Sequence, residues 1–97
     1  MRKIIDYYRR KYGKDVFITE TGMSANDYSR EIKRYNYISE VLKILREKDV
    51  RRIHIWSSID NFEWEREYKD KFGICYDIDF NKKGMCNKYV ELFNKYK

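Results

Sequence analysis

Proline is absent from this sequence, and its four glycines stand singly. Interdomain linkers are usually rich in glycine, serine or proline, and no such stretch occurs here. We also find no internal repeat and no low-complexity segment. The 97 residues are therefore expected to belong to a single domain.

Long apolar runs are missing as well. No segment approaches the roughly 20 apolar residues that a membrane-spanning helix needs, so we expect no membrane partner. The first residues, Met1 to Tyr8, carry charge where a signal peptide has its apolar core. A cytoplasmic location is therefore expected.

Metal-binding side chains are scarce. His54 is the single histidine, and the two cysteines, Cys75 and Cys86, are not in CxxC spacing. A structural zinc site needs about four such ligands, so we expect neither a metal nor a cofactor. Two reduced thiols are favoured over a disulfide in a cytoplasmic protein, although a disulfide stays open. His54 lies within a predicted strand, which favours a packed residue over a catalytic acid or base.

The net charge of +6 raises nucleic acid as a partner. The basic excess lies in two stretches, Arg2 to Lys14 and Arg30 to Arg52, where charges alternate with apolar residues at helical spacing. Such spacing is typical of the solvated faces of helices. From Ile53 onward acidic and basic residues balance, so no nucleic-acid partner is expected.

Apolar periodicity predicts alternating helices and strands. Such alternation is typical of α/β proteins in which parallel strands are joined by right-handed crossovers. Two strands cannot close a core, so the chain is expected to need further strands. The predicted elements are a helix over Arg2–Tyr12 stopped by Gly13, a strand Val16–Thr19, a helix Arg30–Lys48, a strand Ile53–Trp56, a short strand or hairpin arm within Gly73–Asp79, and a C-terminal helix with Tyr89, Leu92, Phe93 and Tyr96 on one face.

Each strand is followed by a loop with residues suited to chemistry, and such loops form the sites of βα folds. Glu20 ends the first strand, where it is either a functional carboxylate or a solvated strand-end acid or helix cap. The second loop, Trp56 to Trp64, holds two indoles, an amide and Glu63. Indole faces stack on sugar rings while carboxylates and amides bind hydroxyl groups, although both tryptophans could instead pack in the core.

Two motifs resemble glycoside hydrolase family 1. The segment Phe17-Ile18-Thr19-Glu20-Thr21-Gly22 is similar to the family's threonine-glutamate-asparagine-glycine nucleophile motif. The segment from Trp56 to Trp64, followed by Tyr68 and Phe72-Gly73, resembles the region after the last barrel strand. The resemblance implies that residues 1–97 are one partial domain, the last two βα units of a (β/α)8 barrel, with strands seven and eight and their flanking helices.

The resemblance also implies roles for single residues. Glu20 would be the nucleophile that forms the glycosyl-enzyme. Glu63 would bind hydroxyl groups of the sugar in the glycone subsite, and Trp56 would form the floor of that subsite. Trp64 would contact sugar hydroxyl groups through its indole N–H, and Phe72 would line the same pocket.

The sequence departs from the family pattern in two respects. Thr21 replaces the asparagine after the nucleophile, which puts efficiency in doubt. The acid/base of the family is the glutamate of an asparagine-glutamate-proline motif, and a chain without proline lacks it. Retaining hydrolysis needs both carboxyl groups, so the chain is expected to be inactive alone and to require a complementary N-terminal barrel segment.

The substrate class also follows from the resemblance. Members that act on 6-phosphorylated glycosides replace the glutamate-tryptophan pair, whereas Glu63 and Trp64 are both present here. A carboxylate facing a phosphate dianion is unfavourable, so an unphosphorylated β-glucoside or β-galactoside is expected. Two other interpretations stay open: a non-catalytic remnant that binds sugar or a partner chain, and a small basic binding module.

Overall fold

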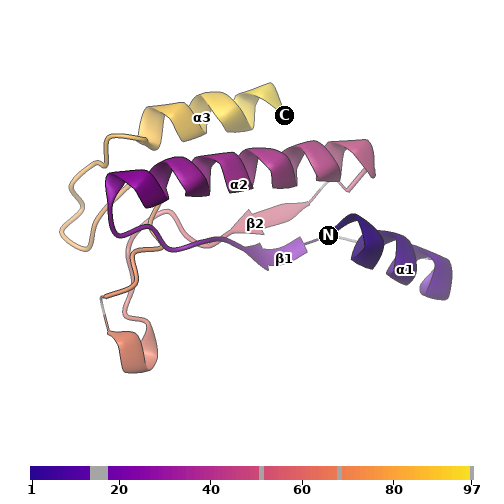
Figure 1. Cartoon of the computed structure of the whole chain (residues 1–97), viewed down its shortest axis with the longest axis horizontal. Helices are drawn as coiled ribbons and strands as arrows, with labels where there is room; N and C mark the ends of the chain where they lie inside the picture. Colours follow the sequence, from indigo (N-terminus) through magenta and orange to yellow (C-terminus); the bar gives the residue numbers. More distant parts are fainter. Residues whose placement is uncertain (14–17, 51, 68, 97) are drawn as a thin grey trace.

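The computed structural model describes residues 1–13, 18–50, 52–67 and 69–96. The order of elements follows the sequence prediction, and the parallel α/β arrangement is confirmed (Figure 1). The first strand ends two residues after its predicted end at Thr19, and Val16 and Phe17 fall outside the described residues. The elements are α1 (Arg2–Tyr12), β1 (Ile18–Thr21), α2 (Tyr28–Glu47), β2 (Ile53–Ile55), a short 3-10 helix η1 (Trp64–Arg66) and α3 (Cys86–Lys95).

Local capping explains where two helices begin or end. Asp27 precedes α2 and accepts a hydrogen bond from the Arg30 backbone N–H at 2.8 Å, so α2 begins two residues before the predicted start. Gly13 ends α1 in the left-handed conformation at φ 61°, as its position predicted. In the described part of the chain, no helix is both long and apolar enough to cross a membrane.

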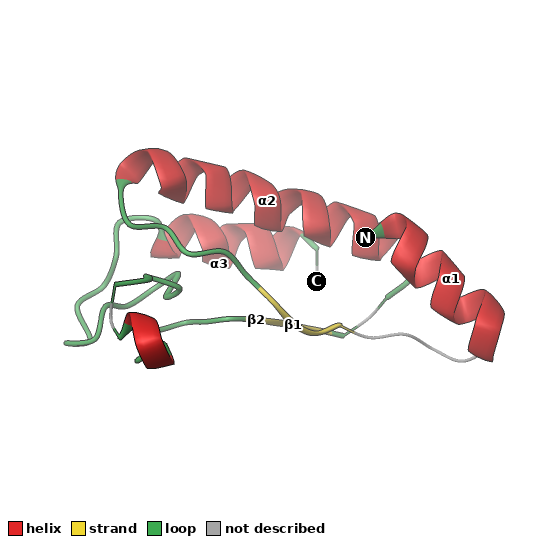
Figure 2. Cartoon of the chain, turned by 60° about the horizontal axis from the view of Figure 1, so that its bottom comes forward, coloured by secondary structure: helices red, strands yellow, loops and turns green. Residues whose placement is uncertain are grey.

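The two strands are parallel, and α2 connects them. Figure 2 shows α2 and α3 on the same side of the strand pair. Apolar residues of α2, α3 and β2 meet in one core cluster that includes Ile38, Leu42, Tyr89 and Leu92, with Ile53 and Ile55 packed against it. The helices therefore cover one face of the strands.

Helix α1 packs beside the carboxyl end of α2. Ile5, the buried residue of α1, packs with Val41, Leu45 and Val50. The Arg9 guanidinium donates hydrogen bonds to the backbone carbonyls that end α2, at Lys48 and Asp49. The negative end of the helix dipole also stabilises a cation at this position.

The segment before α3 corrects two expectations. Cys75 and Cys86 form a disulfide, so the expectation of reduced thiols is wrong. The reason is that the chain folds back before α3 and brings their Cα atoms to 4.3 Å, a proximity that a spacing of 11 residues does not reveal. The region 73–79 forms no strand but only isolated bridges, in which Tyr76 pairs with Ile59 and with Lys82.

A buried ion pair joins the loop after β2 to this segment. Asp60 is 3% exposed, and its carboxylate accepts hydrogen bonds from Lys83 Nζ at 2.7 Å and from the Gly73 backbone N–H at 2.8 Å. Lys83 Nζ also donates to the Gly73 carbonyl at 2.8 Å. These contacts hold the loop that begins at Ser57 against the segment that precedes α3.

We predict that Lys83→Met destabilises the chain by about 3 kcal/mol, because it leaves the Asp60 carboxylate buried without its cation. The measurement is the free energy of unfolding in urea. The exposed neighbour supplies the control, and Lys82→Met should change this free energy by less than about 0.5 kcal/mol. Equal losses in the two variants would contradict the prediction.

Candidate active site

The carboxyl ends of β1 and β2 lie next to each other. The Trp56 backbone N–H donates to the Thr21 carbonyl at 2.7 Å, which joins the two residues that directly follow Glu20 and Ile55. Glu20, near the carboxyl end of β1, and the loop that begins at Trp56 therefore lie at the same edge of the strand pair. Ligands of α/β folds bind at this edge.

An irregular register directs Glu20 away from the helices. Ile18 pairs with Ile53 and Thr21 pairs with Ile55, so β1 advances by three residues where β2 advances by two. Ile18 packs into the core, and yet the Thr21 hydroxyl is also on the helix side, at 3.0 Å from the Tyr37 hydroxyl of α2. Because side chains alternate along a strand, Glu20 faces the opposite side, where it is exposed.

Gly22 permits the close approach of the two loops. A Cβ atom at Gly22 would lie 2.1 Å from the Trp56 carbonyl oxygen, a distance that no side chain can occupy. The backbone after Glu20 therefore touches the backbone at Trp56. This contact explains on steric grounds why glycine is the last residue of the nucleophile-like motif.

The second loop brings Trp56 and Glu63 together. The indole Nε1 of Trp56 donates to Glu63 Oε1 at 2.9 Å, which fixes the direction of the carboxylate. Trp56 is 39% exposed and Trp64 is 82% exposed, so neither is a core residue. The two tryptophans therefore do not pack in the core of the described residues.

Phe72 reaches the same region through its backbone. Its carbonyl accepts a hydrogen bond from the Ser57 N–H at 3.2 Å, and the Ile74 N–H donates to the Ser57 carbonyl at 2.8 Å. The Phe72 side chain is half-buried. The segment that contains Phe72 thus lies against the residue that follows Trp56.

These observations describe an open arrangement in which a carboxylate and a hydrogen-bonded tryptophan-glutamate pair share one edge of parallel strands. The helix-cap explanation for Glu20 does not hold, because Asp27 caps α2. His54 corrects another expectation, since it is exposed rather than packed. The reason is strand alternation: Ile53 and Ile55 face the helices, and His54 faces the uncovered side.

The comparisons with known proteins agree on one family. The family model of glycosyl hydrolase family 1 matches residues 1–95. This chain belongs to glycosyl hydrolase family 1. It is 33% identical to human (Homo sapiens) lactase/phlorizin hydrolase over 75% of this chain and 4% of that protein. It is also 33% identical to beta-glucosidase 4 of Oryza sativa subsp. japonica, over 88% of this chain and 20% of that protein.

A solved structure shows the same relationship. The crystal structure of a beta-glucosidase from Exiguobacterium marinum superimposes with a TM-score of 0.76 and 25% sequence identity, covering 99% of this chain and 25% of that chain. The family 1 chain described here thus spans a quarter of that structure and a fifth or less of the two curated relatives.

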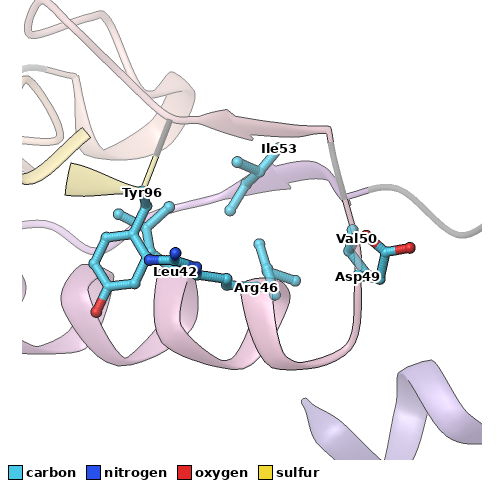
Figure 3. A pocket seen from close by; sticks show the side chains of 7 residues that line it. Leu42, Arg46, Asp49, Val50, Ile53 and Tyr96 are labelled. Atoms are coloured by element: carbon cyan, nitrogen blue, oxygen red, sulfur yellow. The ribbon is translucent and has the colours of Figure 1, made fainter. Parts of the chain in front are cut away.

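Two hollows in the described part of this family 1 chain lie away from Glu20. A cavity of about 290 Å³ opens at the amino end of β2, where Val50, Ile53, Leu42 and Tyr96 line it (Figure 3). A second cavity of about 300 Å³ lies beside Ile55 and Phe93. Both are on the helix side of β2 rather than at the carboxyl edge, so they do not form the candidate site.

Several residues that support the site were not predicted from the sequence. Asn61 donates through Nδ2 to the Ser57 hydroxyl at 3.2 Å and to the Ile59 carbonyl at 2.8 Å, which folds the loop after Trp56. Asp60 and Asn61 lie within the segment from Trp56 to Trp64, and their place in that family-like segment is the one sequence feature that could have indicated this supporting role. In the described residues, no group of three or more potential metal ligands gathers.

Gly22→Ala is expected to separate the Glu20 loop from Trp56, because its Cβ would overlap the Trp56 carbonyl. We predict a loss of about 1–3 kcal/mol in unfolding free energy, together with a changed tryptophan emission spectrum. Gly84→Ala is the matched control, since nothing lies within 4 Å of its Cβ position. An unchanged spectrum in Gly22→Ala would show that the loops do not meet as described.

Proposed function

We propose that this chain supplies the nucleophile and the glycone-binding residues of a retaining β-glycosidase. The observation that carries the proposal is the exposed Glu20 at the carboxyl end of β1, beside the Trp56–Glu63 pair. Membership of glycosyl hydrolase family 1 supports it. The two strands then correspond to strands seven and eight of a (β/α)8 barrel.

In the proposed reaction, a Glu20 oxygen attacks the anomeric carbon of the sugar, and the bond from that carbon to the leaving oxygen breaks. The leaving oxygen takes a proton from a second carboxyl group, and water later releases the sugar from Glu20. The two carboxyl groups of a retaining enzyme lie about 5–5.5 Å apart. Without proline, this chain has no asparagine-glutamate-proline motif to supply the second one.

The second loop would bind the sugar. The Glu63 carboxylate accepts one hydrogen bond from Trp56 Nε1 and keeps lone pairs for sugar hydroxyl groups. Trp56, which is 39% exposed, would offer a stacking surface as the floor of the subsite, and Trp64, which is 82% exposed, would offer its indole N–H to sugar hydroxyl groups. Phe72 would add an apolar wall.

The edge of β2 that faces away from β1 supports completion by a further barrel segment. The backbone N–H and C=O groups of successive strand residues point to alternate edges of the strand. Those of Ile53 and Ile55 point away from β1. A parallel strand added at that edge would pair with these backbone groups. We propose that an N-terminal barrel segment is this partner.

The proposed substrate is an unphosphorylated β-glucoside or β-galactoside. The curated relatives named above are a lactase/phlorizin hydrolase and a beta-glucosidase, which supports this class. Glu63 places a carboxylate where a 6-phosphate would meet like charge. Hydrolysis of 6-phosphoglycosides alone by the complete enzyme would contradict this assignment.

A second function is favoured by a different observation. The sugar-binding residues are present while the chain carries only one of the two required carboxyl groups, so a non-catalytic protein that binds sugar or a partner chain fits the same geometry. The complementation experiment below separates the two functions.

The test mixes this chain with an N-terminal segment, lacking the last two βα units, from a family 1 β-glucosidase. We expect hydrolysis of an activated aryl β-glucoside only when both pieces are present. Glu20→Gln should abolish this activity, with a loss of at least about 10²-fold, because the amide is a poor nucleophile.

The control for folding is Glu91→Gln, an exposed change on α3 that should leave the rate unchanged. Activity that survives Glu20→Gln would contradict the assigned nucleophile. A folded complex that binds glucose but hydrolyses nothing would favour the non-catalytic function.

A further inference from the structure

Arg34 is a fully buried cation on α2, the helix that covers the strands next to the candidate site. It lies in α2 with 0% exposure, although arginine is seldom buried completely. Its Nε donates to the Tyr89 hydroxyl of α3 at 3.3 Å, and the guanidinium lies 6.0 Å from the centre of the Tyr89 ring. The proposed chemistry uses neither residue.

The charge of Arg34 is only weakly compensated. The Glu31 carboxylate is 3.9 Å from Nη2, and Nη2 has no hydrogen-bond partner among the residues that the structure describes. Burial raises the pKa of Tyr89 while the Arg34 contact opposes that rise, so the phenol stays neutral and cancels no charge. Removing a charge from water costs several kcal/mol, and an imperfect pair does not recover it. Stability alone therefore gives no sufficient reason for an arginine here.

The remaining donor, Nη1, reaches both loops of the site. It donates to the Lys71 carbonyl at 2.9 Å and lies 3.5 Å from the Met23 carbonyl, a longer contact. Met23 follows Glu20 by three residues, and Lys71 directly precedes Phe72. One planar group thus contacts the backbone of the loop after β1 and the backbone of the loop after β2.

The same two loops are also joined directly to each other by hydrogen bonds next to Arg34. The Ala25 N–H donates to the Lys71 carbonyl at 2.9 Å, and the Lys71 N–H donates to Asn26 Oδ1 at 3.1 Å. The next residue, Phe72, then accepts from the Ser57 N–H beside Trp56. A displacement of Lys71 would therefore move backbone on both sides of the site.

We propose that Arg34 is a positioning residue that fixes the loop after β1 (residues 22–27) and the loop that contains Phe72 relative to each other. Its planar fork supplies several donors in fixed directions, which a lysine with one nitrogen cannot reproduce. The catalytic consequence of this role rests on the proposed glycosidase function, whereas the structural coupling of the loops does not.

The test is amide hydrogen exchange of the 97-residue chain, measured at single residues. In Arg34→Lys the charge is kept but the fork is lost, so we expect the Ala25 and Lys71 amides to exchange at least about tenfold faster. The amides of Val41 to Leu45 in the core of α2 should keep their wild-type rates. Arg30→Lys, an exposed change on the same helix, is the control and should alter none of them.

Two outcomes would overturn the proposal. In one, Arg34→Lys keeps the wild-type exchange of both loops, which would mean that a buried charge is enough. In the other, exchange rises equally throughout α2 and α3, which would mean that Arg34 serves the core alone. Arg34→Met, which fits the same space without donors, should accelerate the two loops at least as much.

A second arm measures the reaction in the complemented enzyme. Arg34→Lys should lower kcat by up to about 10²-fold, because Glu20 and the sugar are then misaligned, and should also raise KM, because Phe72 moves with its loop. An unchanged kcat would overturn the catalytic part of the proposal. A wild-type complex without activity would count against the proposed function, whereas the exchange result would still decide the positioning role.

Discussion

The hydrogen bond from the Trp56 N–H to the Thr21 carbonyl is the contact on which the rest of the site depends. It joins the carboxyl ends of two parallel strands, and the extra residue in β1 turns Glu20 to the uncovered side. Gly22 can then lie against the Trp56 backbone, where a Cβ would overlap. The backbone at Thr21, Gly22 and Trp56 thus determines where the Glu20 carboxylate and the Trp56 indole lie.

Buried polar groups hold the loops beyond these strands together with the apolar packing of Ile74 and Met85. Asp60 and Lys83 join the loop after β2 to the segment before α3, and Arg34 contacts the carbonyls of both site loops from behind. Loops contain many backbone groups that cannot pair within helices or sheets. Side-chain donors and acceptors of this kind satisfy them, and they also define the position of the loops.

Sequence patterns predicted what depends on local periodicity and on motif. The helices, the parallel strands, the Gly13 terminus and the exposed carboxylate at the end of β1 follow from such signals. The Cys75–Cys86 disulfide and the role of Arg34 depend on segments that meet only in three dimensions. An arginine within a basic helix gives no sign of burial, so periodicity could not single it out.

Covalent trapping tests most directly whether Glu20 is the nucleophile. A 2-deoxy-2-fluoro-β-glucoside with a good leaving group would be added to the complemented enzyme, because the fluorine destabilises the oxocarbenium-like transition states and the intermediate accumulates. Mass spectrometry of the digested complex should find the sugar on the peptide that contains Glu20. A sugar attached to Glu63 instead, or a complex that hydrolyses glucosides without any such adduct, would contradict that role of Glu20.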